Sequence, residues 1–126
     1  MFRGKRVDNG DWIEGFYAHS GEKKYILIDN DIAVGYLAMK EVNPDTIGQC
    51  TGLTDKNGKM IFEGDIVNYN GTNHKVVFET RGESAYFGIE ISNIETWGFC
   101  LEVPAKLMNV IGNIHDNPEL LRSDIE

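Results

Sequence analysis

The sequence has few of the residues that build metal centres and disulfide frameworks. It contains two cysteines, Cys50 and Cys100, and three histidines, His19, His74 and His115. None of them has the close pairwise spacing of a structural zinc site, so no metal ligands are predicted. No motif of a catalytic cysteine surrounds either thiol, and we expect both cysteines to be buried and reduced rather than disulfide-bonded.

Long apolar runs are also absent. A membrane helix needs about 18 or more apolar residues in succession, and no run in this chain approaches that length. The N-terminal stretch MFRGKRVDNGDW lacks the apolar core of a signal peptide. We therefore expect a cytoplasmic protein with no membrane partner. The 126 residues are 41% hydrophobic, enough for a chain that folds around its own core.

Positive charge is scarce, because the formal net charge is -8. Only the first ten residues are clearly basic, with Arg3, Lys5 and Arg6 against Asp8. Nucleic-acid binding depends on Lys and Arg that displace counterions from phosphates, so the balance disfavours a general DNA or RNA binder. It leaves open a local basic and aromatic face around these cations and Trp12.

Aromatic side chains offer possible stacking platforms for single-stranded nucleic acid. The candidates are the tryptophans and tyrosines of the chain: Trp12, Tyr17, Tyr25, Tyr36, Tyr69, Tyr86 and Trp97. Basic residues do not interleave with most of them. Core or rim packing is therefore the favoured interpretation of these aromatics, with nucleic-acid binding as the alternative.

The sequence does contain a period of two residues, which is typical of half-buried strands. In AYFGIEI, Phe87, Ile89 and Ile91 share one face, and in HKVVFET we expect Val76 and Phe78 to point inward. Strands are predicted at residues 2–7, 12–18, 24–28, 33–39, 60–62, 65–69, 74–80, 86–91, 99–101 and 107–112. Many short strands indicate a small barrel or a sandwich.

Turn signals separate these strands. Asn-Gly pairs begin at positions 9, 57 and 70, and each predicts a hairpin because Asn and Gly tolerate positive φ. The stretch EVNPDTIGQC, residues 41–50, breaks the alternation and marks a boundary between residues 1–50 and 51–126. Near the C-terminus, Asn117 as cap, Pro118 and Glu119 predict a short helix with Leu120 and Leu121 on its apolar face.

The stretch TGLTDKNGKMIFEGDIVNY, residues 51–69, crowds glycines and acids together. As a phosphate loop it fails, because five residues separate Gly52 from Gly58 and Met60 replaces the expected Ser or Thr. As a calcium loop it fails, because the first and twelfth ligand positions are Leu53 and Gly64. No ligand-binding loop is predicted here.

A hairpin explains the same stretch. Residues 55–59 form a turn built on Asn57 and Gly58, and Glu63 with Gly64 forms a bend that leads into the next strand. We expect the Asp65 carboxylate to accept backbone N–H groups from that bend. Glu63 and Asp65 also lie close enough for a paired-carboxylate site, but solvated turn acids are the favoured interpretation in so acidic a chain.

Three blocks carry a resemblance to a known family: FRGKRVDNGDWIEGFY, PDTIGQCTGLTDKNGKMIFEGDIV and VIGNIHDNPELL. In this order they resemble the YopX family of small proteins from bacteriophages, prophages and their hosts. The resemblance implies an SH3-like barrel from residue 51 to about residue 113, with residues 1–50 as an N-terminal β region laid against it. It implies no established activity and no catalytic residue.

The expectation is a mainly β protein: a small SH3-like β-barrel with an N-terminal β region (residues 1–50) and a short C-terminal helix. We predict a non-enzymatic, phage- or prophage-related module that binds a host or phage protein or assembles with copies of itself. The alternative is a nucleic-acid-binding accessory protein that uses a barrel face. No catalytic, cofactor-binding or metal-binding residues and no cofactor are predicted.

Overall fold

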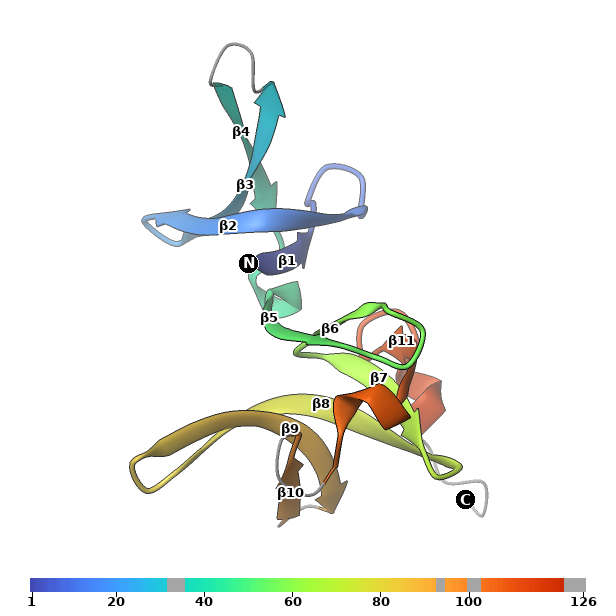
Figure 1. Ribbon diagram of the computed structural model, residues 1–126. Coiled ribbons are helices and arrows are strands. Elements are labelled where there is room, and N and C mark those ends of the chain that lie inside the picture. The colour runs from blue at the N-terminus through green and yellow to red at the C-terminus, as the bar shows by residue number, and fades with distance from the viewer. Residues whose placement is uncertain (32–35, 93–94, 100–102, 122–126) are drawn as a thin grey trace. The chain divides into compact units, whose positions relative to one another are not determined.

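The computed structural model describes residues 1–31, 36–92, 95–99 and 103–121, and most of them lie in antiparallel strands (Figure 1). The chain divides into two compact units, Met1–Cys50 and Thr51–Glu126. Strand β5, Gly48–Thr54, has residues in both. No helix in the described residues combines the length and the apolar character needed to cross a membrane.

The first unit is a set of hairpins. Its strands are β1 (Phe2–Lys5), β2 (Trp12–Ser20), β3 (Lys23–Asp31) and β4 (Tyr36–Val42), followed by the 3-10 helix η1 (Pro44–Thr46) and the start of β5. They pair in the order β4-β3-β2-β1-β5, and this sheet ends on β6. Ile26 and Val42 are fully buried, and the Val42 side chain packs over Gly4, where a Cβ would lie 3.0 Å from it.

The second unit is built on a five-stranded sheet with the order β10-β9-β8-β7-β11. Its elements are β6 (Met60–Phe62), β7 (Asp65–Tyr69), β8 (Thr72–Arg81), β9 (Ser84–Ser92), β10 (Glu95–Gly98), η2 (Ala105–Leu107), β11 (Asn109–Asn113) and η3 (Pro118–Leu121). The hairpin of β8 and β9 reaches well beyond the other strands as a curved ribbon (Figure 1).

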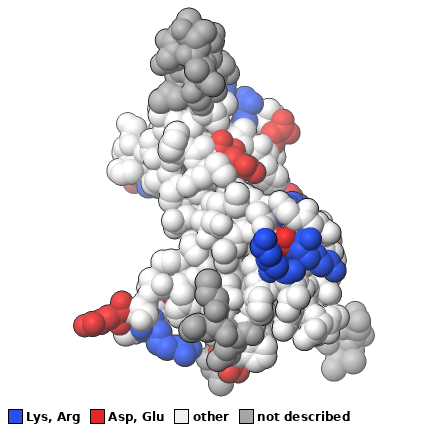
Figure 2. All heavy atoms as spheres, in the orientation of Figure 1, with Lys and Arg blue, Asp and Glu red and all other residues white. Residues whose placement is uncertain are grey.

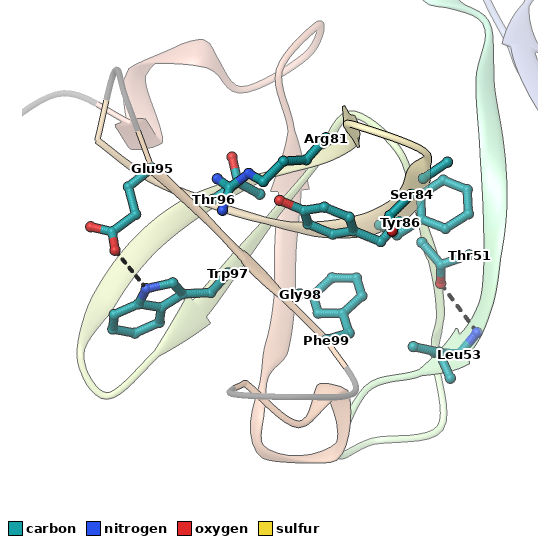
Figure 3. A pocket seen from close by; sticks show the side chains of 12 residues that line it. Thr51, Leu53, Arg81, Ser84, Tyr86, Glu95, Thr96, Trp97, Gly98 and Phe99 are labelled. Carbon is teal, nitrogen blue, oxygen red and sulfur yellow. Dashed lines mark hydrogen bonds between the residues drawn. The ribbon is translucent and has the colours of Figure 1, made fainter.

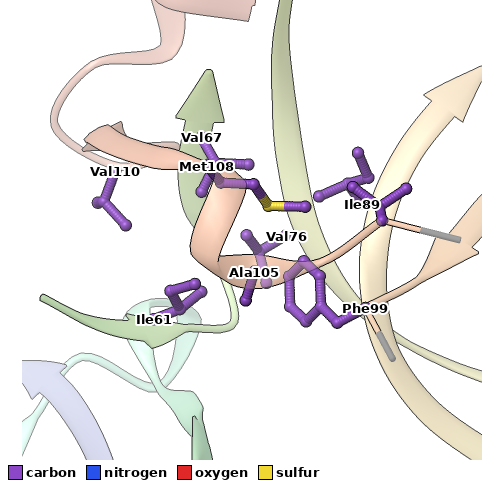
Figure 4. Close-up of a cluster of buried hydrophobic side chains, with 9 residues drawn as sticks. Ile61, Val67, Val76, Ile89, Phe99, Ala105, Met108 and Val110 are labelled. Atoms are coloured by element: carbon purple, nitrogen blue, oxygen red, sulfur yellow. The ribbon is translucent and has the colours of Figure 1, made fainter. Parts of the chain in front are cut away.

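One apolar cluster forms the core of the second unit (Figure 4). Its members come from β6 to β9, from η2 and β11 and from the segment after β10: Ile61, Val67, Val76, Ile89, Phe99, Val103, Ala105, Met108 and Val110. Burial of this apolar surface is the main force that holds the strands together. Five residues are partly buried against the cluster: Leu53, Tyr69, Phe87, Ile91 and Trp97. We refer to the side that carries Leu53, Phe87 and Trp97 as its open side.

The three Asn-Gly hairpin predictions are confirmed. Asn70 and Gly71 have φ of 53° and 80° and join β7 to β8, with Tyr69 opposite Thr72, as in a type I′ turn. Gly58, with φ of 81°, lies in the turn between β5 and β6, and the turn after β1 contains Gly10 with φ of 76°. Local backbone chemistry alone was enough to locate these turns.

The prediction of a closed SH3-like barrel is wrong. The described strands form two open antiparallel sheets, and the second of them ends on β10 and β11 without pairing the two edges. The other sheet has β4 and β6 as its edges, and within the described residues β5 pairs only with β1 and β6. Alternating side chains specify strands, whereas closure depends on pairings between distant segments.

The prediction of a C-terminal helix is also wrong. Pro118–Leu121 is a four-residue 3-10 helix, with the i to i+3 bond from the Leu120 N–H to the Asn117 carbonyl at 3.1 Å. The Oδ1 atom of Asn117 accepts the N–H of Asn113, which precedes it in the chain, at 3.3 Å. That side chain lies against Gly112, where a Cβ would come within 2.5 Å of Oδ1.

Other differences from the predicted strands are smaller. Residues 48–54 and 95–98 are strands that the sequence pattern missed. The strand predicted at residues 107–112 is β11, Asn109–Asn113, and Leu107 belongs to the 3-10 helix η2 instead. Val76 is buried as expected, but Phe78 is 44% exposed, because it lies where the hairpin extends past the core. Cys50 is a half-buried thiol. Cys100 and predicted strand residues 33–35 and 100–101 lie outside the described residues.

Candidate functional site

The two buried aspartates of the stretch from Thr51 to Tyr69 form hydrogen bonds with the backbone. Asp55 is 3% exposed. Its Oδ1 accepts the N–H groups of Asn57 and Lys59 at 2.9 Å each, and its Oδ2 accepts the N–H of Val110 at 2.9 Å. The carboxylate therefore organises the β5–β6 turn and joins it to β11, which confirms the hairpin interpretation of this stretch.

The ionised form of Asp55 is favoured by this arrangement. Burial opposes the charge, but hydrogen bonds from the N–H groups of Val110, Lys59 and Asn57, together with the positive charge of Lys59, outweigh it and lower the pKa of Asp55 below its usual value. Figure 2 shows basic side chains gathered over the β5–β6 turn, where Lys56 and Lys59 are exposed. A buried acid thus lies beneath a basic surface.

Asp65 has the predicted role. It is 2% exposed, and its Oδ2 accepts the N–H of Phe62 at 2.8 Å across the Glu63–Gly64 bend. Within residues 1–31, 36–92, 95–99 and 103–121, no group of three or more His, Cys, Asp or Glu side chains is arranged to hold a metal ion. Both buried aspartates accept hydrogen bonds from backbone N–H groups.

The predicted basic and aromatic face forms in part in the first unit. The guanidinium of Arg3 lies 4.7 Å and the ammonium of Lys5 lies 5.6 Å from the centre of the Trp12 ring. Arg6 instead forms a bidentate ion pair with Asp8, at 2.6 and 2.9 Å, which lowers the pKa of Asp8. The ring is therefore occupied by the protein's own cations.

A cavity lies in the second unit, on the open side of the core (Figure 3). It has a volume of about 630 Å³. Its walls come from β5, from both strands of the β8–β9 hairpin near its tip and from β10: Thr51, Leu53, Arg81, Ser84, Ala85, Tyr86, Phe87, Glu95, Thr96, Trp97, Gly98 and Phe99. We refer to it as the edge pocket.

Aromatic and aliphatic groups form the floor of the edge pocket. Leu53, Phe87 and Trp97 pack against the buried core from this side, and Phe99 belongs to the core itself. The Tyr86 ring lies against Gly98, where a Cβ would be 3.4 Å from the ring edge. The glycine therefore leaves space above the tyrosine that a larger residue would fill.

Among the described residues that line the edge pocket, the charged ones are Arg81 and Glu95. Glu95 Oε1 accepts the indole N–H of Trp97 at 3.4 Å, so it positions the tryptophan at the rim. Arg81 is exposed and forms no salt bridge with a described residue. An apolar floor with a few polar groups around it is typical of a binding pocket.

Only a weak signal in the sequence pointed to this pocket. Tyr86 and Trp97 were among the candidate stacking aromatics, and the structure brings them together, whereas Trp12 lies in the first unit. Arg81 and Glu95 had no distinguishing pattern in the sequence. Their convergence depends on the curvature of the β8–β9 hairpin and on β10. The period of two residues predicted the two hairpin strands, but neither their curvature nor β10.

Fold and pocket together define a small antiparallel β protein with a hollow along one sheet edge. The family model described as YopX protein matches residues 1–122, so the chain belongs to the YopX family. The crystal structure of protein EF1440 from Enterococcus faecalis is similar, with 25% sequence identity, a TM-score of 0.55 and 96% of each chain covered. No curated protein matches the chain.

Proposed function

We propose that this protein is a non-enzymatic binding module and that its second unit takes up a segment of another protein in the edge pocket. The observation that carries the proposal is the apolar, aromatic-lined cavity on the open side of the core. The partner is a host or phage protein in the bacterial cytoplasm. Self-association through the same pocket is the competing form of this function.

The chemistry of the lining favours binding over catalysis. Among the described residues that line the pocket, the hydroxyl groups belong to Thr51, Ser84, Tyr86 and Thr96, and none is a histidine or cysteine. A nucleophilic hydroxyl needs a base within hydrogen-bond reach, and Glu95 is already bonded to Trp97. These groups instead suit a ligand that offers polar atoms around an apolar centre.

The shape of the lining favours a chain segment over a compact small molecule. Two walls are stretches of consecutive residues, 84–87 of β9 and 95–99 in and after β10. The volume lies within the range of about 300–1,000 Å³ found for ligand pockets. Walls that follow two strands make an elongated site, which an extended polypeptide fills better than a round ligand.

A displayed library of short random peptides tests this function. Peptides selected on the whole chain are measured again on Trp97→Ala and on Trp12→Ala, which removes the other tryptophan of the chain from the first unit. We expect binding to be lost in Trp97→Ala and retained in Trp12→Ala. Selection of no peptide, or equal loss in both variants, contradicts the proposal. A concentration-dependent mass in light scattering that Trp97→Ala abolishes identifies self-association.

A second candidate function is nucleic-acid binding, which the position of Arg3 and Lys5 over Trp12 favours. Two observations weaken it: the Nε and Nη2 atoms of Arg3 are buried, and Arg6 is paired with Asp8. Fluorescence anisotropy with labelled single-stranded and double-stranded DNA at low salt is the test, because the electrostatic contribution is largest there. Binding that Lys5→Gln weakens would support this function.

A further inference from the structure

Strand β9 is paired along only part of its outer edge. On its inner side it pairs with β8 over Ser84 to Ile89. On its outer side β10 pairs with it from Gly88 to Ser92. Among the described residues no strand pairs with that outer side before Gly88, apart from one hydrogen bond at Phe87. Among the described residues, the outer edge of β9 therefore has no paired strand from the hairpin tip to Gly88, which lies opposite Gly98 at the end of β10.

The backbone groups that point outward can be assigned. The Phe87 carbonyl accepts the N–H of Phe99 at 3.3 Å, so the polar groups of Phe87 face away from β8. Residues in an antiparallel strand alternate between inward and outward hydrogen bonding, so those of Ala85, two positions earlier, face outward as well. Ala85 is exposed and lines the edge pocket. One N–H and one C=O are thus presented to the pocket.

The edge pocket follows this strand edge. Successive residues of a strand point to opposite faces of the sheet, yet Tyr86 and Phe87 both line the pocket. A cavity on one face would be lined by only one of them. The pocket therefore wraps around the edge. Phe87 and Leu53 pack against the core on one side. Tyr86 and Arg81 belong to the other face of the paired strands, because their positions alternate with those of Phe87 and its partner Phe78.

We propose that the occupant of the edge pocket is an extended peptide strand that pairs with β9 at Ala85. This inference rests on the proposed function and specifies the conformation and chemistry of the partner segment. Main-chain hydrogen bonds to Ala85 supply a contribution that is independent of sequence, and alternate side chains of the bound strand supply specificity.

The pocket walls define those side chains. On the core side, Leu53, Phe87 and Phe99 suit an aliphatic or aromatic side chain. On the opposite face, the exposed Arg81 suits a carboxylate, because no described residue neutralises it. Side chains on opposite faces are an odd number of positions apart in a strand. The partner is therefore an extended segment with an acidic residue next to, or three positions from, an apolar anchor.

A proline scan of the hairpin edges tests the pairing. Ala85→Pro removes the outward N–H at the proposed contact without removing a bond to β8. Thr80→Pro is the matched control, because Thr80 lies directly opposite Ala85. Its N–H faces the other edge of the hairpin, since Val76, four residues earlier on the same strand, accepts the N–H of Gly64 on that side at 3.0 Å.

The probes are synthetic peptides of alternating valine and threonine that carry glutamate at one position, together with the same peptides carrying lysine there. We expect the glutamate peptides to bind and Arg81→Glu to reverse the preference. Ala85→Pro should weaken binding by about fivefold or more, as expected for a lost hydrogen bond, with little change in Thr80→Pro. Binding that is equally strong to Ala85→Pro overturns strand pairing.

N-methylation of the peptide keeps the test decisive if a proline variant does not fold. One set of alternate peptide nitrogens faces β9 and the other set faces away from it. Methylation of the first set should abolish binding, and methylation of the second should leave binding unchanged. Binding that no methyl group affects overturns the proposal. Failure of all alternating peptides also overturns it. If random peptides nevertheless bind in a manner that depends on Trp97, the proposed function stands and only strand pairing fails.

Discussion

The Oδ2 atom of Asp55 accepts the backbone N–H of Val110 at 2.9 Å, across 55 positions of sequence. The same side chain holds the β5–β6 turn through Asn57 and Lys59. A second contact ties the turn to β11, because the N–H of Lys56 donates to the Met108 carbonyl at 3.0 Å. The last strand of the second unit is therefore joined to its first turn by polar contacts as well as by the core.

Replacement of Asp55 by asparagine should destabilise the protein by about 1–3 kcal/mol. Asparagine offers one acceptor oxygen where the carboxylate offers two. Its NH₂ group, a donor, would therefore face another donor, either the N–H of Val110 or the N–H groups of the turn. Urea-induced unfolding followed by circular dichroism measures the change. Asp45→Asn, at an exposed aspartate in η1, is the control and should match the wild type. Equal stability of the two variants would contradict this role of Asp55.

Acid should weaken the fold through the same residue. The pKa of Asp55 is lowered in the folded state, relative to about 4 in an unfolded chain. The folded state therefore binds protons less readily, so the stabilisation is present above about pH 4 and is lost as the pH falls through the folded pKa. Unfolding curves between neutral and acid pH should show a smaller acid-induced loss in Asp55→Asn. An equal loss of stability in the wild type and in Asp55→Asn would mean that other carboxylates cause the acid sensitivity.

Two glycines that face each other in β9 and β10 should respond differently to alanine. Gly88 pairs with Gly98, but a Cβ at Gly88 would lie 2.2 Å from the Trp97 carbonyl oxygen, whereas one at Gly98 would lie 3.4 Å from the Tyr86 ring. Gly88→Ala should cost about 1–3 kcal/mol, and Gly98→Ala should stay within about 0.5 kcal/mol. Thermal unfolding of the two variants measures the difference. Equal unfolding midpoints for Gly88→Ala and Gly98→Ala would refute the prediction.

Gly58 should be sensitive to substitution through its backbone conformation. Its φ is 81°, and a Cβ at this position would have no atom within 4 Å, so a side chain meets strain rather than a clash. Gly58→Val should cost about 1–2 kcal/mol, whereas Gly58→Asn should cost less, because asparagine tolerates this region. Glu63→Gln keeps the shape of the neighbouring bend and should leave the fold intact. Chemical unfolding that finds the valine variant as stable as the asparagine variant, or more so, would contradict the strain argument.

Local chemistry made much of the second unit predictable. Strands Met60–Phe62 and Asp65–Tyr69 have the predicted bounds, because Gly58, Gly64 and the Asn70-Gly71 pair fix their ends. The alternation around Ile89 indicated the correct inward face, since a strand buried on one side shows its face directly in the sequence.

The features that the sequence did not reveal depend on distant pairings. Strand β5 contains two glycines and two threonines, so its alternation is weak, and its pairing with β1 is visible only in three dimensions. Whether the second sheet closes, and where a strand edge stays unpaired, both depend on such distant pairings. Trp97 and Arg81 both reach the pocket because of the curvature of the β8–β9 hairpin, which no local pattern encodes.

The three hydrogen bonds to Asp55 also imply an order of events during folding. Those from Asn57 and Lys59 span two and four positions, so they can form with the turn, whereas the bond from Val110 requires closure of a long loop, which is slower. Pulse-labelled hydrogen exchange during refolding should find the Lys59 amide protected before the Val110 amide. Simultaneous protection of the two amides would contradict this order of events. The hydrogen bonds of one carboxylate would then form in two stages, first within the β5–β6 turn and later with β11.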